Sequence, residues 1–372
     1  MHADRFRPLL GVTGPFVSVY FDDTHDTADA EAQLDARLRD IRKHLEDAAD
    51  EGLVNTAVIP AIEAAVRAKH PPVGRSGRGL IAAGTRIVTD QHLAVPPVAT
   101  IVRVSELPYI LPIVEHGVPH TSYLLVAVDS TGADISLHDN GRTAGQTVEG
   151  SGYPVHKAHG AETAGYGGPQ GRVEEAVRRN IREVAEHLTT LADDTGADVV
   201  FITGEVASRA ELLAELPERV AVKAVQLQGG GRTAGTDPAE VAHEIAAEFT
   251  ARRLAVIEDA VARFNAGHGA GLAIEGLANV TTALRDGSVE TLIIGDLGNA
   301  TVVADHDQLL MSGPDATTVS ALGGSPDRVL PADEALPLLA VTCGASLVSV
   351  GQRLSPADGI AAVLRYADPN IG

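Results

Sequence analysis

The segment "GYGGPQGRVEEAVRRNIREVAEHL", residues 165–188, decides how the middle of the chain is interpreted. Its first part contains four glycines and a proline, a composition that is typical of a loop. In its second part, apolar side chains recur at helical spacing, which predicts an amphipathic helix from about Arg172 to Leu191. Glu174 and Glu175 lie in the first turn of this helix, where they complement its dipole. The apolar face contains Val173, Val177, Val184, Leu188 and Leu191.

Strand-like runs lie on both sides of this helix. The segment "SYLLVAVDSTGADISLHDNG", residues 122–141, contains two runs separated by turn residues, which predicts a hairpin. After the helix, "ADVVFITGE" (197–205) predicts a buried strand, "RAELLAEL" (209–216) a helix and "VAVKAVQL" (220–227) a second strand. Because strands and helices alternate, we expect an α/β layer domain here.

The residues before this domain predict another α/β domain. The expected elements are a strand at 16–23, helices at about 26–49 and 58–68, and a hairpin within 79–95. The residues after it start with the linker "QGGGRTAGTDP" (228–238). The expected elements there are helices at 238–264 and 274–285 and a strand at 290–298.

Together these patterns predict a mixed α/β fold with three domains. We place the domains at residues 1–118, 119–228 and 229–372. In the linker, "GGGR" around Arg232 is interpreted as a flexible hinge.

Charge and composition limit the possible functions. The net charge of −21 argues against indiscriminate binding to nucleic acid. The three predicted domains have net charges of −4, −7 and −10, so the surface of the last one is expected to contact a partner protein or to face solvent. No apolar run is long enough to predict a membrane span. With a single cysteine, Cys343, an intrachain disulfide is impossible, and a reduced cytoplasm is the expected setting.

Two basic groups are candidate contacts for RNA phosphates. Arg75 and Arg78 alternate with glycines, so guanidinium groups and bare backbone amides lie together. A second group flanks the start of the helix at 172–191, where backbone N–H groups without partners favour anions. It contains Arg172, Arg178, Arg179 and Arg182. The alternative is a solvated helix face with ion pairs between Glu174 and Arg178 and between Glu175 and Arg179.

Other chemistry has weaker support in the sequence. A phosphate loop of the G-x-x-x-x-G-K-[ST] type and a G-x-S-x-G elbow are absent. His138, His156 and His159 were considered as metal ligands, but acidic or cysteine ligands at a recognisable spacing do not accompany them. Cys343 lies in an apolar run and is expected to be a buried structural thiol. We predict no metal and no cofactor.

The order of these segments resembles the eukaryotic and archaeal class-1 release factors and their relative Pelota. "FVSVYF" and "RGLIAAGTRIVT" resemble the opening strand and hairpin of the first domain of that family, and "SYLLVAVDSTGADI" resembles the hairpin of the second. "GYGGPQGRVEEAVRRNIREVAEHL" resembles the tip loop and long helix, and "ALRDGSVETLIIGDL" (283–297) resembles a signature of the third domain. Within the family, the chain looks most similar to a bacterial branch that includes the hibernation factor Balon and its mycobacterial relatives.

The chain departs from the family pattern at two places, the tip loop of the first domain and the tip loop of the second. Stop-codon readers of the family have an Asn-Ile-Lys-Ser tip in the first domain, and this chain instead has "HLEDAADEGLVN" (44–55), so stop-codon recognition is not expected. At the Gly-Gly-Gln tip, Pro169 separates Gly168 from Gln170. Pro169 fixes its own φ and lacks an N–H, which argues against hydrolysis of peptidyl-tRNA. As the alternative, "GGPQG" (167–171) fits the Gly-x-x-Gln tip of related quality-control hydrolases, with Gln170 as its catalytic residue.

The resemblance implies a ribosome-binding hibernation factor that occupies the A site of vacant or stalled ribosomes under stress. Its partners would be the 70S ribosome, elongation factor Tu and P-site tRNA. The three domains would face the decoding centre, the peptidyl-transferase centre and the GTPase side, in that order. The candidate RNA-binding residues are Arg75, Arg78, Gly167, Gly168, Gln170, Arg172 and Arg179. A peptidyl-tRNA hydrolase that rescues stalled ribosomes is the alternative function.

Overall fold

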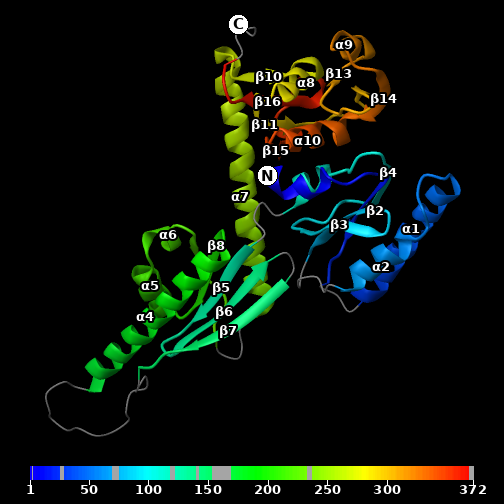
Figure 1. Cartoon of the computed structure of the whole chain (residues 1–372). Coiled ribbons are helices and arrows are strands. Elements are labelled where there is room, and N and C mark those ends of the chain that lie inside the picture. The colour runs from blue at the N-terminus through cyan, green and yellow to red at the C-terminus, as the bar shows by residue number, and fades with distance from the viewer. Residues whose placement is uncertain are drawn as a thin grey trace. The chain divides into compact units, whose positions relative to one another are not determined.

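The computed structural model describes residues 1, 3–25, 29–68, 75–117, 122–139, 142–152, 169–232 and 237–367. The chain divides into two compact units. Unit 1 combines Met1–Pro119 with Thr250–Gly372, and unit 2 is His120–Phe249. Their second boundary falls inside the long helix α7 (Pro238–Gly267), which was expected at 238–264. The fold is mixed α/β, as predicted (Figure 1). The predicted domain boundaries stay a prediction.

Unit 2 contains a five-stranded sheet in the order β7-β6-β5-β8-β9. Its strands are β5 (Ser122–Val128), β6 (Gly132–Asp139), β7 (Arg142–Glu149), β8 (Val199–Gly204) and β9 (Ala224–Gln226). The β5–β6 pair is the expected hairpin, and β5 pairs in parallel with β8. The parallel pair needs a crossover connection, which contains helix α4 (Pro169–Thr195).

Helix α4 follows the predicted amphipathic pattern, and its backbone begins three residues before Arg172. Ile181, Val184 and Leu188 are fully buried on one face of the helix. They share a core with Leu124 and Val126 of β5. Helix α5 (Val206–Glu215) packs beside α4 (Figure 1). Apolar periodicity therefore identified both the helix and the face that it buries.

The strand predicted at 220–227 is wrong over its first half. A short helix, α6 (Glu218–Ala221), precedes the three-residue strand β9. The carbonyl oxygen of Pro217 accepts hydrogen bonds from the amides of Val220 and Ala221. Proline just before a helical turn is favourable, because its φ is fixed near the helical value and it needs no N–H partner.

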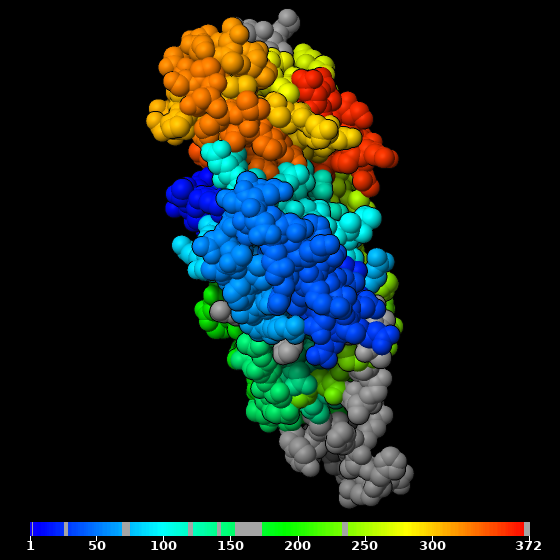
Figure 2. All heavy atoms as spheres, turned by 90° about the vertical axis from the view of Figure 1, so that its right-hand side faces the viewer, coloured from blue at the N-terminus to red at the C-terminus, as the bar shows by residue number. Residues whose placement is uncertain are grey.

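The N-terminal part of unit 1 is a sheet in the order β3-β2-β1-β4. Its strands are β1 (Phe16–Asp22), β2 (Gly77–Ala83), β3 (Arg86–Leu93) and β4 (Ile101–Ser105). Helices α1 (Ala30–Asp50) and α2 (Val58–Ala68) cover one face, and their atoms cover this side of unit 1 in Figure 2. The 3-10 helix η1 (Ala3–Leu9) and helix α3 (Leu111–His116) share the core of the other face.

The C-terminal part of unit 1 has a sheet in the order β10-β16-β11-β15 and a smaller one in the order β13-β12-β14. The strands of the first are β10 (Ala273–Glu275), β16 (Ile360–Leu364), β11 (Val289–Ile294) and β15 (Ser346–Ser349). Those of the second are β13 (Ser312–Gly313), β12 (Thr301–Asp305) and β14 (Pro326–Pro331). The accompanying helices are α8 (Leu277–Arg285), α9 (Ala316–Ala321) and α10 (Ala332–Thr342), with 3-10 turns η2 (His268–Ala270), η3 (Gly351–Arg353) and η4 (Ala357–Gly359).

Helix α8 begins three residues after the predicted start at 274. Ile274 instead lies in β10, opposite Ala362 of β16. Gly276 follows with a φ of +87°, a backbone conformation that favours glycine and separates the strand from the helix. Among the described residues, the helices are too short or too polar to cross a membrane.

The two parts of unit 1 share one core and are also joined by ion pairs. Nη1 of Arg103 on β4 donates to Oδ2 of Asp333 at 2.9 Å and to Oε1 of Glu334 at 3.0 Å. The guanidinium of Arg103 also lies over the ring of Tyr109, 3.7 Å from its centroid. The side chain of Glu334 is 1 % exposed. Burial raises the pKa of this carboxyl above its ordinary value, although Arg103 acts against the shift.

We predict that Arg103→Met lowers the free energy of unfolding by about 2 kcal/mol near neutral pH, because Glu334 loses its buried counter-charge. The pKa of Glu334 then rises further in the folded state. Between the unfolded and the raised folded pKa, the folded protein binds more protons, so lowering the pH restores part of the loss. Urea unfolding at about pH 7 and about pH 5 measures both effects.

The control for this change is Arg86→Met. Arg86 is exposed at the start of β3, and a change there is expected to stay within about 0.5 kcal/mol at either pH. An Arg103→Met variant as stable as this control would contradict the ion pair's role.

Candidate functional site

The predicted tip lies at the start of α4. Gly167 and Gly168 lie outside the described residues. The backbone of Gln170 and of Arg172 belongs to the first turns of α4, since the helix begins at Pro169. The side chains that the structure describes on either side of the tip precede residue 153 and follow residue 172.

A buried asparagine on α4 fixes the chain before the tip. Asn180 is 1 % exposed. Its Oδ1 accepts a hydrogen bond from the amide of Gly152 at 2.7 Å, and its Nδ2 donates to the carbonyl oxygen of Ser130 at 3.0 Å. One side chain therefore holds both the β5–β6 turn and the chain that leaves β7. A buried amide group without hydrogen-bond partners costs free energy, so the need to satisfy Asn180 fixes the positions of Gly152 and Ser130 relative to α4.

One turn further along α4, Glu183 holds Ser151. The amide of Ser151 donates to Oε2 of Glu183 at 2.8 Å, and its hydroxyl donates to the other carboxylate oxygen. These hydrogen bonds lower the pKa of Glu183, and the positive charge of Arg179 adds to the effect. Together, Asn180 and Glu183 with residues 150–152 form what we call the α4 clamp.

The clamp requires glycine at both ends of its loop. A Cβ atom on Gly150 would lie 2.1 Å from Oδ1 of Asn180. A Cβ atom on Gly152 would lie 2.4 Å from the carbonyl oxygen of Ala176. Only a residue without a side chain allows the backbone to approach α4 so closely. Sequence reasoning missed the clamp, although a Gly-Ser-Gly run and an asparagine inside an amphipathic helix were available as signals.

The clamp lies well along α4 from its first residue. Asn180 follows Pro169 by eleven helical residues, which corresponds to about 16 Å along the axis. Within this stretch Arg178 and Arg179 are exposed, and Arg182 lies just beyond it.

The two arginines of the first domain have different surroundings. Arg75 is exposed before β2. Arg78 is fully buried, so its predicted contact with RNA is wrong. Its guanidinium donates to Asp90 at 2.9 Å and to the carbonyl oxygens of Val66 and Ala65 at 2.8 and 2.7 Å. Arg78 thus satisfies carbonyl groups at the end of α2 that lack helical partners.

Arg232 is an anchor, and the hinge interpretation is wrong for this residue. Its Nη1 donates to Oδ1 of Asp129 at 3.0 Å, and its Nη2 donates to Oε1 of Glu149 at 2.8 Å. A third carboxylate, that of Asp134, lies 3.4 Å from Nε. Burial acts against the charge, but the hydrogen bonds from these acids hold the pKa of Arg232 above its ordinary value. Residue 232 of the linker is therefore fixed to the acids of the β5–β6 turn and of strands β6 and β7.

The histidine and cysteine candidates have structural surroundings. The ring of His138 stacks on that of Tyr123, with centroids 4.5 Å apart. Burial lowers its pKa. His156 and His159 lie outside the described residues, and the described part of the chain brings together no three metal-ligating side chains. The Sγ of Cys343 lies 2.8 Å from the carbonyl oxygen of Leu284, and burial raises the pKa of this thiol.

Comparison with known proteins places the chain in a family. A family model described as bacterial archaeo-eukaryotic release factor family 2 matches residues 122–270. The chain is 46 % identical, over its whole length and 98 % of the relative, to a protein of Mycobacterium tuberculosis H37Rv called Rv2629. The corresponding protein of strain CDC 1551 is equally similar. The chain therefore belongs to the same family as Rv2629, within the bacterial archaeo-eukaryotic release factors.

Solved structures give more distant matches. A structure of Pelota from Archaeoglobus fulgidus matches with 13 % identity and a TM-score of 0.36, over 78 % of this chain and 84 % of that one. A ribosome-bound archaeal Pelota with ABCE1 matches with 13 % identity and a TM-score of 0.40, over 98 % and 94 % of the two chains. These two matches assign no role to individual residues of this chain.

We predict that Asn180→Ala lowers the free energy of unfolding by about 2 kcal/mol, because the amide of Gly152 and the carbonyl of Ser130 lose their partner. Thermal unfolding measures the loss, and hydrogen exchange at the Gly152 amide should become faster. The control is Asn279→Ala on α8, where an exposed amide donates to Glu275 at 3.1 Å. Unchanged exchange at Gly152 in Asn180→Ala would disprove the clamp.

Proposed function

We propose that this protein binds in the ribosomal A site of vacant or stalled ribosomes and blocks it under stress. In this proposal unit 2 directs the start of α4 towards the peptidyl-transferase centre, and the N-terminal sheet faces the decoding centre. The RNA-binding residues are Arg75, Gly167, Gly168, Gln170 and, on α4, Arg172 and Arg179. Membership of a release factor family supports a role at the ribosome.

The observation that carries the proposal is the α4 clamp. It fixes residues 151 and 152 to Glu183 and Asn180 of α4. Asn180 lies eleven residues, or about 16 Å of helix, from Pro169 at the start of α4. A rigid support of this kind lowers the conformational entropy that is lost on docking to RNA. The backbone amides of the first turn of α4 lack helical partners and favour an anion such as phosphate.

The charge pattern favours contact with RNA at a few arginines, because the chain as a whole is too acidic to be attracted to RNA. The chain as a whole carries a charge of −21. Arg178 and Arg179 are exposed beside the predicted tip, and none of the described acids forms an ion pair with either one within 4 Å. The chain would therefore be repelled from RNA except where these arginines and Arg75 approach phosphates.

Blocking is favoured over hydrolysis because of Pro169. The residue lies at the first position of α4, where proline is well accommodated. It has no backbone N–H to offer to a developing oxyanion, and Gln170 follows it inside the helix. In this proposal Gln170 donates hydrogen bonds that hold the tip, without activating water.

The decisive test uses ribosomes with peptidyl-tRNA in the P site and an empty A site. We expect release of the nascent peptide to stay at background with the wild-type protein and with Gln170→Ala. Co-sedimentation with the ribosome should weaken by about two- to threefold in Gln170→Ala, which removes one set of side-chain hydrogen bonds. Release that requires the wild-type protein and disappears in Gln170→Ala would instead establish the hydrolase.

Two further variants make the binding test specific. Arg75→Ala and Arg179→Ala each remove an exposed charge and should reduce the salt dependence of co-sedimentation. Arg86→Ala, at an exposed position outside the proposed contacts, is the matched control. Equal salt dependence in all three variants would remove Arg75 and Arg179 from the interface.

The proposed protein partner is elongation factor Tu, which would contact the residues from 229 onwards. These residues have a net charge of −10, which favours protein over RNA as their contact. We predict that the full-length protein binds purified elongation factor Tu and that higher salt weakens the association. Equilibrium binding at two salt concentrations measures this. Binding only in the presence of ribosomes would show that the contact surface is composite.

A further inference from the structure

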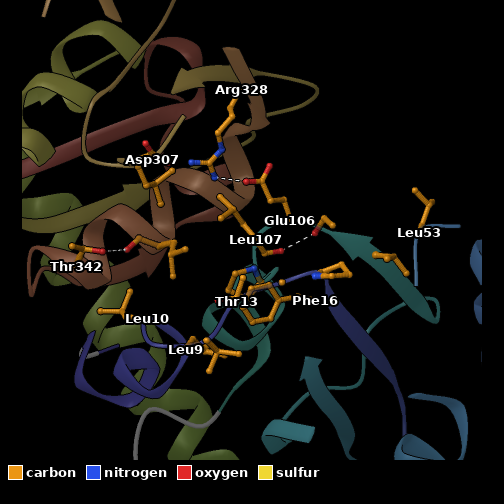
Figure 3. Close-up of a pocket in the computed structure, with 18 residues that line it drawn as sticks. Leu9, Leu10, Thr13, Phe16, Leu53, Glu106, Leu107, Asp307, Arg328 and Thr342 are labelled. Atoms are coloured by element: carbon orange, nitrogen blue, oxygen red, sulfur yellow. Dashed lines mark hydrogen bonds and ion pairs between the residues drawn. The ribbon is translucent and has the colours of Figure 1, made fainter. Parts of the chain in front are cut away.

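Unit 1 contains an open cleft where its N-terminal and C-terminal parts meet. The cleft has a volume of about 750 Å³, within the range of sites that hold a few side chains. Leucines line its floor and walls, from η1, the loop after β4 and the loop after β12 (Figure 3). This cleft is separate from the α4 clamp and from the proposed RNA contacts.

Several polar groups of the cleft already have hydrogen-bond or ion-pair partners within the protein. Nη2 of Arg328 lies 2.5 Å from Oε1 of Glu106, and the two side chains point toward each other in Figure 3. The hydroxyl of Ser105 donates to the carbonyl oxygen of Leu107 at 2.7 Å. The hydroxyl of Thr342 donates to Leu338 at 3.0 Å. The cleft therefore presents apolar surface, with few free directional hydrogen-bonding groups for a polar small molecule.

Two leucines at opposite sides of the cleft are exposed. Leu10 is 41 % exposed after η1, and Leu53 is 50 % exposed after α1 (Figure 3). The backbone of Leu53 is fixed in place, because its amide donates to Ala48 and that of Gly52 donates to Ala49. Gly52 has a φ of +77°, which completes a Schellman motif at the end of the helix. This motif holds Leu53 at the surface at no further entropic cost.

The unpaired charge that lines the cleft is negative. Asp307 is exposed, and within the described part of the chain no cation pairs with its carboxylate. Asp50 and Glu51, three and two positions before Leu53 in the chain, are also exposed. The charge of Arg328 is neutralised by Glu106. An RNA backbone would be repelled by this negative charge, whereas a cationic side chain would be attracted.

We propose that this cleft binds a basic, apolar segment of a partner protein. The segment places apolar side chains against Leu10 and Leu53 and a lysine or arginine beside Asp307. The charge of Asp307 selects the basic residue, and the exposed leucines supply apolar area to be buried. The proposal does not depend on A-site binding.

The experiment uses the full-length protein and a fluorescent synthetic peptide of leucine and lysine in a helical repeat. Fluorescence anisotropy measures its binding. We expect the double variant Leu10→Ser, Leu53→Ser to bind about tenfold more weakly, and Asp307→Asn to bind about threefold more weakly with a smaller salt dependence. A peptide with glutamate in place of lysine should not bind.

The matched control is the double variant Val98→Ser, Val329→Ser, which removes two exposed apolar side chains outside the cleft. It should bind the peptide as the wild-type protein does, and thermal unfolding verifies that every variant is folded. Equal binding by the cleft and control variants would overturn the proposal. A wild-type dimer that the Leu10→Ser, Leu53→Ser variant dissolves would also overturn it, in favour of a second copy as occupant. Displacement of the peptide by a uridine oligonucleotide would overturn it in favour of RNA.

Discussion

The apolar core that η1, the N-terminal sheet and helix α10 share is the constraint on which unit 1 depends. Phe6 and Leu9 of η1, Tyr20 of β1 and Leu336 and Leu339 of α10 belong to one continuous core. Each such side chain contributes about 1.5–3 kcal/mol when it is removed from water. Residues from the two ends of the sequence therefore fold as one body. The ion pairs of Arg103 and Arg328 lie around this core and fix how its two halves fit.

The same core explains the cleft. Helix α10 packs against η1, and Leu9 and Leu339 are both buried, whereas Asp307, which lines the cleft, is exposed. Apolar side chains at the margin of a core are ordinarily covered by a neighbouring element. Here Leu10 and Leu53 keep much of their surface in water.

In unit 2, the sheet and a set of polar contacts support the long helix α4, whose start extends past the sheet. The sheet buries the middle of α4, and Asn180 and Glu183 accept hydrogen bonds from the backbone of the chain that leaves β7. Arg232 adds an attachment of its own to acids of the β5–β6 turn, β6 and β7. Polar side chains therefore fix both the chain after β7 and the chain after β9 to unit 2.

The sequence by itself determined the elements with strong periodicity. The helix predicted at 58–68 is α2, and the strand predicted at 16–23 is β1, because burial on fixed faces leaves a repeat that can be read directly. Local pattern failed at 220–227, where β-branched residues suggested a strand although Pro217 favours a helical turn. The order of the motifs identified the family, since many weak matches in one sequence order are jointly specific.

Only the tertiary structure decided which charged residues are available for binding. Arg75 and Arg78 are three residues apart in one glycine-rich run, and the sequence treats them alike. In the fold, Arg75 is exposed before β2 begins, while Arg78 lies within β2, a strand buried on both faces, where its guanidinium meets Asp90 and the end of α2. Arg232 lies among glycines, yet the acids that hold it are some 80 to 100 residues away in the chain. Burial and long-range pairing depend on which segments meet in space, and a local sequence pattern does not contain that information.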